Sequence, residues 1–72
     1  MSMRIRLSEA ALLPQLVEHL LAHDCVAQPV DEQTCAIVHV HAQDAAEALI
    51  EVLFFLRAWK AQHAAVRAFL YV

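Results

Sequence analysis

Apolar and other residues alternate along the first and the last segments of the chain. Residues 3–7 read MRIRL, and in residues 66–72 every second position, starting from Val66, is aliphatic while Arg67, Phe69 and Tyr71 stand between. A repeat of two is typical of a strand with one buried and one exposed face. The pattern predicts half-buried strands over residues 3–7 and 66–72.

The next segment has the spacing of an amphipathic helix. Proline is tolerated in the first turn of a helix but not in its interior, so Pro14 places the helix start at about this residue, after an irregular or single-turn lead-in over residues 8–13. We expect the helix to end near Asp24. Its apolar side contains Leu13, Leu16, Val17, Leu20 and Leu21, and its other side contains Gln15, Glu18, His19, Ala22 and His23.

A second, longer helix is predicted to follow Asp44. Glu47 stands three residues after this aspartate, which is a variant of the capping box, and helical character continues to about His63. The predicted core stripe consists of Ala45, Leu49, Val52, Leu53, Leu56 and Trp59, flanked by Phe55. Ile50, Phe54 and Ala61 form a second apolar stripe on another sector, which the same sheet cannot cover.

The middle of the chain is typical of a hairpin. Residues 25–30 and 34–41 are rich in strand-forming residues, and the polar residues 31–33 join them. The second of these strands can bury Ala36, Val38 and Val40, or the alternate set Cys35, Ile37, His39 and His41. The first set is preferred, because burial of two imidazoles costs more free energy.

The predicted order is therefore strand, helix, strand, strand, helix, strand. This order is typical of the ferredoxin-like α+β fold, with a four-stranded antiparallel sheet in the order 4-1-3-2 and both helices on one face. Right-handed crossovers then make residues 3–7 and 66–72 adjacent antiparallel strands. Residues 1–72 are expected to form one domain, with Leu56 and Trp59 buried.

The composition restricts the classes of function. The 72 residues carry a net charge of −3, which argues against neutralising the phosphates of duplex DNA. The absence of glycine excludes phosphate-cradling loops of the Walker and Rossmann kinds. No apolar run approaches the length of a membrane span and no secretory signal is evident, so a cytoplasmic location is expected, with Met1 and Ser2 a dispensable leader or a cloning remnant.

Residues 56–63 read LRAWKAQH and lie between the capped helix and the final strand. In this segment and in length the chain resembles small actinobacterial proteins, a likeness that implies no activity. In element order it also resembles ACT regulatory domains, heavy-metal-associated domains and RNA-recognition motifs, which would imply ligand, metal or RNA binding. The chain has no glycine after the first strand, no CxxC, and no aromatic residue in its first and third strands, where those families carry their functional motifs.

Candidate catalytic and metal-binding residues are few. His19 and His23 stand at i and i+4, a spacing at which two imidazoles can bind one metal ion. Two ligands make a weak site, so we expect these histidines to lie on a solvated helix face. Cys25 and Cys35 are expected to be buried apolar residues that do not oppose each other in the hairpin. No catalytic residue, metal or cofactor is therefore predicted.

Two surfaces remain as candidate interfaces, one that mixes apolar and charged residues and one that is apolar. Strand alternation assigns Arg4, Arg6, Arg67, Phe69 and Tyr71 to the helix-free face of the sheet, joined by Ile37, His39 and His41. Ile50 and Phe54 form the other surface, on the long helix. We expect a non-enzymatic domain that forms a homodimer or docks on another protein, because so short a chain has a small core. The alternatives are an ACT-like ligand-binding module and a single-stranded nucleic-acid binder.

Overall fold

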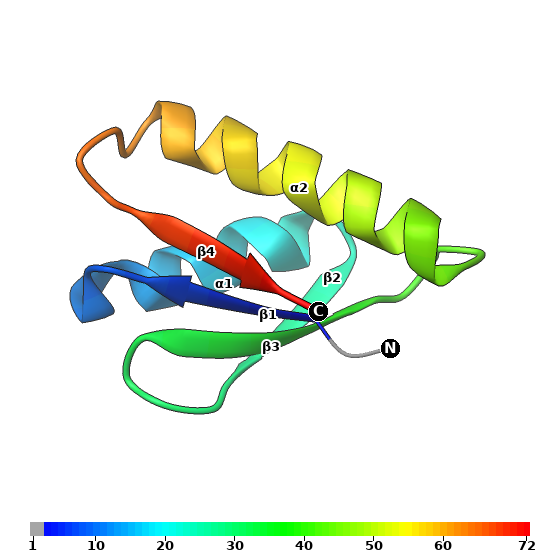
Figure 1. Ribbon diagram of the computed structural model, residues 1–72, viewed down its shortest axis with the longest axis horizontal. Helices are drawn as coiled ribbons and strands as arrows, with labels where there is room; N and C mark the ends of the chain where they lie inside the picture. Colours follow the sequence, from blue (N-terminus) through cyan, green and yellow to red (C-terminus); the bar gives the residue numbers. More distant parts are fainter. Residues whose placement is uncertain (1–2) are drawn as a thin grey trace.

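The computed structural model describes residues 3–72 and contains four strands and two α-helices (Figure 1). Met1 and Ser2, the expected leader, lie outside the described residues. From the amino end, the elements are β1 (Met3–Leu7), the 3-10 turn η1 (Ala10–Leu12), α1 (Leu13–Ala22), β2 (Cys25–Pro29), β3 (Thr34–His39), α2 (Ala45–Ala61) and β4 (Ala68–Tyr71).

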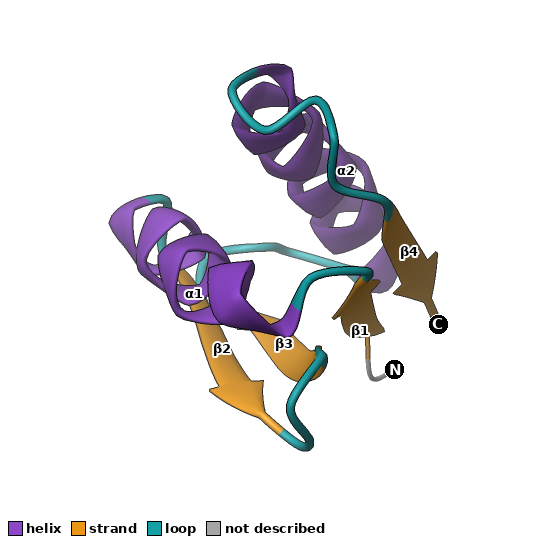
Figure 2. Cartoon of the chain, turned by 90° about the vertical axis from the view of Figure 1, so that its left-hand side faces the viewer, coloured by secondary structure: helices purple, strands orange, loops and turns teal. Residues whose placement is uncertain are grey.

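The strands form one antiparallel sheet in the order β2-β3-β1-β4. Both helices cover the same face of this sheet and leave the other face open (Figure 2). The first strand pairs with the last, with Arg4 opposite Tyr71 and Arg6 opposite Phe69. The sequence-based prediction of a ferredoxin-like α+β fold, including its strand order, is thus confirmed.

Local sequence signals explain the helix boundaries. Pro14 lies in the first turn of α1, after η1, where its missing amide would have no partner in any case. The turn after α1 needs one residue with positive φ, and in a chain without glycine Asp24 supplies it, at φ 63°. At the start of α2, the Asp44 side chain accepts a hydrogen bond of 2.8 Å from the Glu47 amide, which confirms the predicted cap.

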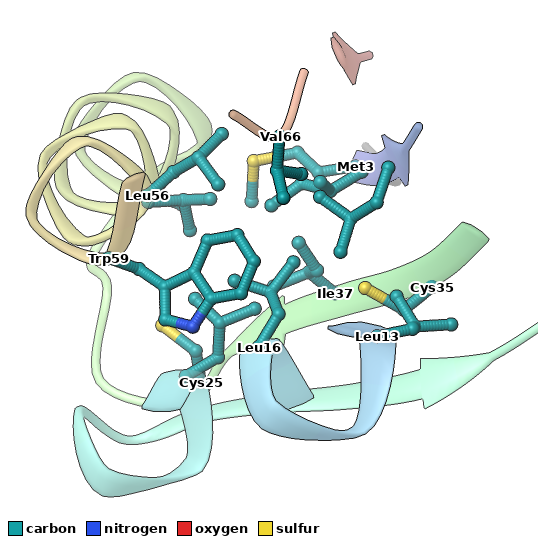
Figure 3. Packing of buried hydrophobic residues seen from close by; sticks show 14 residues of the cluster. Met3, Leu13, Leu16, Cys25, Cys35, Ile37, Leu56, Trp59 and Val66 are labelled. Atoms are coloured by element: carbon teal, nitrogen blue, oxygen red, sulfur yellow. The ribbon is translucent and has the colours of Figure 1, made fainter. Parts of the chain in front are cut away.

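The core lies between the sheet and the two helices. The Trp59 indole reaches from α2 into the centre of the cluster (Figure 3), and both Trp59 and Leu56 are buried as predicted. The buried sector of α2 differs slightly from the predicted one: Ala48 is buried, whereas Ala45 and Leu53 are exposed. The remaining buried apolar residues are Met3, Ile5, Leu7, Leu13, Leu16, Leu20, Cys25, Cys35, Ile37, Val52 and Val66.

The prediction that β3 buries the face with Ala36, Val38 and Val40 is wrong. Ile37 is 3% exposed and Cys35 is fully buried, whereas Val38 is 65% exposed and Val40 is exposed as well. The prediction rested on the cost of burying imidazoles. That cost is offset here, because the buried His39 side chain has the carboxylate of an α2 residue within hydrogen-bond distance.

Candidate functional site

The open face of the sheet presents aromatic and basic side chains in neighbouring rows. Arg4, Arg6, Phe69 and Tyr71 are all exposed, and cross-strand pairing sets one arginine beside each aromatic residue. Arg67, which directly precedes β4, is exposed too. Five of the eight residues predicted for the open face thus lie on it or at its margin.

Three residues predicted for this face lie elsewhere. Ile37 is in the core and His39 points to the helices, since the strand is turned the other way. His41 follows the end of β3 and is exposed, with its ring 3.9 Å from an Asp24 carboxylate oxygen. Their places on the open face are taken by Val38 and its cross-strand partner Val26, both exposed. Correct alternation in β3 would have identified this pair.

The open face contains a hollow of about 460 Å³ next to the β2–β3 turn. It is lined by Arg4, Arg6, Val30, Asp31, Thr34, Tyr71 and Val72. The hydrogen bond from the Gln33 amide to Asp31, 2.8 Å long, lowers the pKa of the Asp31 carboxyl, with further contributions from Thr34 and Arg6. Within residues 3–72 neither Arg4 nor Arg6 forms a salt bridge. The hollow therefore presents two guanidinium groups beside the ionised carboxylate of Asp31.

The second candidate surface is the outer side of α2. Ile50 is 67% exposed and Phe54 is 69% exposed, and Leu53, expected in the core, joins them at the surface. We call these three residues the outer stripe. Arg57 lies close to its centre, three residues after Phe54, and Glu47 lies at its margin one helical turn before Ile50. Since Val52 and Leu56 fill the core side, α2 is apolar on both sides.

Histidines join the helices to one another and to the sheet. The Nε2 atom of His19 lies 3.0 Å from the carbonyl oxygen of Phe55, so His19 is half-buried rather than on a solvated helix face. The His23 ring, which is exposed, stacks on Phe55 at 4.5 Å between ring centroids. His39 Nε2 lies 3.2 Å from Glu51 Oε1, which joins β3 to α2. These imidazoles are thus engaged in packing contacts.

The thiols are poorly placed for chemistry. Cys25 and Cys35 are buried and free, and in the hairpin register they face His39 and Pro29 rather than each other, as predicted. Burial raises the pKa of both thiols, so they stay protonated at neutral pH. In the part of the chain that the structure describes, no three His, Cys, Asp or Glu side chains gather in a group that could hold a metal ion.

Comparison with protein-family models, with curated proteins and with solved structures finds no match to this chain. Neither helix within residues 3–72 combines the length and apolar character that crossing a bilayer requires. The open sheet face and the outer stripe of α2 are the two candidate surfaces of this domain.

Proposed function

We propose that this chain is a small non-enzymatic domain that forms a homodimer through the outer stripe of α2. The observation that carries the proposal is that α2 exposes Ile50 and Phe54 directly opposite its buried sector. Large apolar side chains that are exposed next to one another commonly mark an interaction surface. A monomer would leave this stripe in water, whereas a second copy covers it.

The arrangement of residues along α2 favours an antiparallel pair. A two-fold axis at the level of Val52 sets Ile50 opposite Phe54 of the second copy, so that the two most exposed apolar side chains cover each other. The same register sets Glu47 opposite Arg57 of the second copy. Apolar and charged positions are therefore self-complementary, which is what an isologous interface requires.

The size of the chain supports the same conclusion. A core built from 72 residues leaves little surplus over the conformational entropy lost on folding. Both cysteines are free, so no disulfide adds stability within the described residues. Burial between two copies adds apolar area without lengthening the chain.

The test is the solution mass of the full chain, measured by light scattering after size-exclusion chromatography. We expect the mass of two chains at about 100 μM, a concentration at which a dimer with a Kd of about 1 μM is almost fully formed. Phe54→Glu should give the mass of one chain with unchanged helical circular dichroism, whereas Gln43→Glu, a matched exposed control outside the stripe, should remain dimeric. A monomeric wild-type chain refutes the proposal.

A charge exchange tests the antiparallel register itself. Arg57→Glu should weaken the dimer, because it sets two carboxylates against each other at each end, and Glu47→Lys in the same chain should restore it. If instead Phe69→Glu gives monomers while Phe54→Glu does not, the interface is the open sheet face and the α2 proposal is wrong.

The open sheet face admits the two alternatives named from the sequence, an ACT-like ligand module and a single-stranded nucleic-acid binder. Phe69 and Tyr71 could stack bases, and the hollow beside Arg4 and Arg6 could hold a small anion. The net charge of −3 disfavours the nucleic acid. The dimer proposal accounts for the stripe on α2, which neither alternative uses.

A further inference from the structure

The two edges of the sheet differ in how they are protected. Edge strands expose unpaired amides and carbonyls, and proteins commonly block them with proline or charged residues. The β2 edge contains Pro29, and the charged residues Asp31 and Glu32 follow it in the β2–β3 turn. The β4 edge, residues 68–71, contains neither proline nor charge, and in Figure 2 no other segment lies on its outer side. β4 is therefore the unprotected edge.

The hydrogen-bond pattern identifies which β4 groups are unpaired. The Ser8 amide donates a bond of 2.9 Å to the Arg67 carbonyl oxygen, and bonded and non-bonded pairs alternate in an antiparallel ladder. In the observed register, Phe69 and Tyr71 therefore exchange bonds with β1. The amides and carbonyls of Ala68 and Leu70 point away from the sheet, where a further strand can pair with them.

The charges beside this edge indicate what such a strand should carry. The chain has five lysine and arginine residues and an excess of acidic ones, yet Arg4, Arg6 and Arg67 all lie in or next to β1 and β4, which contain no acidic residue. A strand added to β4 would place every second side chain on the open face, next to Phe69 and Tyr71. Carboxylates at these positions can reach across the aromatic rings to the arginines.

We propose that β4 binds an extended acidic peptide segment of a partner protein by strand addition. Its backbone pairs with Ala68 and Leu70, and its acidic side chains pair with Arg4 and Arg6, the arginines opposite Tyr71 and Phe69 in the register. A second copy of the chain fits this edge less well, because it would bring another basic edge against the first. The site is separate from the outer stripe of α2.

The probe is a short fluorescein-labelled peptide in which glutamate alternates with valine, and the measurement is fluorescence anisotropy with the full chain. We expect saturable binding that weakens with added salt, and no binding of the matched peptide in which lysine replaces glutamate. Arg6→Gln should weaken binding about tenfold, in the range of an interface anchor. Lys60→Gln, which removes a positive charge on α2 outside the outer stripe, should leave binding unchanged.

Two measurements separate strand addition from simple charge attraction. Ala68→Pro removes an outward amide and no bond to β1, so it should abolish peptide binding while circular dichroism stays native. In the wild-type chain, hydrogen exchange of the Ala68 and Leu70 amides should slow when peptide is added. Binding that survives in a folded Ala68→Pro variant overturns the proposal, as does protection that falls on other amides. The amides of Ala68 and Leu70 could instead be protected without peptide while Phe54→Glu keeps the mass of two chains. That result would show that the β4 edge binds a second copy, and it would also overturn the proposal.

Discussion

Neighbouring residues of β3 should respond oppositely to truncation. Ile37→Ala removes three carbons from a side chain that is 3% exposed. At about 0.8 kcal/mol per buried methylene the transfer term is about 2.4 kcal/mol, and the cavity left behind brings the total loss within about 2–5 kcal/mol. Val38→Ala truncates a side chain on the open face and should cost less than about 0.5 kcal/mol. A domain of 72 residues has a total stability of only about 4–11 kcal/mol. The expected difference in free energy of unfolding between Ile37→Ala and Val38→Ala is therefore a large fraction of that total.

Urea unfolding provides the assay, with Trp59 fluorescence and far-ultraviolet circular dichroism recorded on the same samples. Trp59 is buried in the core that Ile37 joins, so its emission should report loss of packing. Both variants must be compared at one chain concentration, because the proposed dimerisation would make stability concentration-dependent. If Val38→Ala costs more than Ile37→Ala, β3 is buried through the opposite face and the open surface described above is wrong.

Three further predictions concern the core, the histidines and the thiols. Leu56→Ala should cost about 2–5 kcal/mol, and a cost below about 0.5 kcal/mol, as expected for Ile50→Ala in a monomeric background, would place Leu56 at the surface. Stoichiometric zinc binding is not expected in calorimetry at neutral pH, and a zinc-dependent rise in Tm that disappears in His19→Ala would contradict this. Burial raises the pKa of Cys25 and Cys35, so the folded chain keeps these thiols protonated when the unfolded chain has begun to ionise them. The urea midpoint should therefore fall as pH rises above about 8.5, and this fall should be shallower when both residues are alanine; equal slopes for the two chains would refute this.

Much of the fold could be predicted because its signals are local. Alternation in β1, the position of Pro14 and the Asp44 cap each depend on residues only a few positions apart. Together they define the element order, and the handedness of crossovers then fixes the strand order. The placement of Arg4 and Tyr71 on the open face followed from the same local alternation.

The orientation of β3 could not be obtained in this way. Both of its faces carry apolar residues, so the choice depends on partners distant in the sequence. His39 is acceptable inside because Glu51 of α2 lies 3.2 Å from its ring, and Cys35 is buried opposite Ile5 of β1. Neither partner is visible from residues 34–41 alone. The hollow on the open face was missed for the same reason, since the β2–β3 turn and β4 line it together.

The pairing of β1 with β4 also determines when the domain can form during synthesis. β1, one of the two central strands, is made first, but one of its two neighbours is the last strand of the fold. While the ribosome still holds residues 68–71, β1 has one edge unpaired and the sheet that supports α2 is incomplete. Such non-local pairing slows folding, and an incomplete sheet exposes apolar surface in the meantime. The nascent chain should therefore acquire protease resistance in a single late step, when β4 leaves the exit tunnel, rather than element by element.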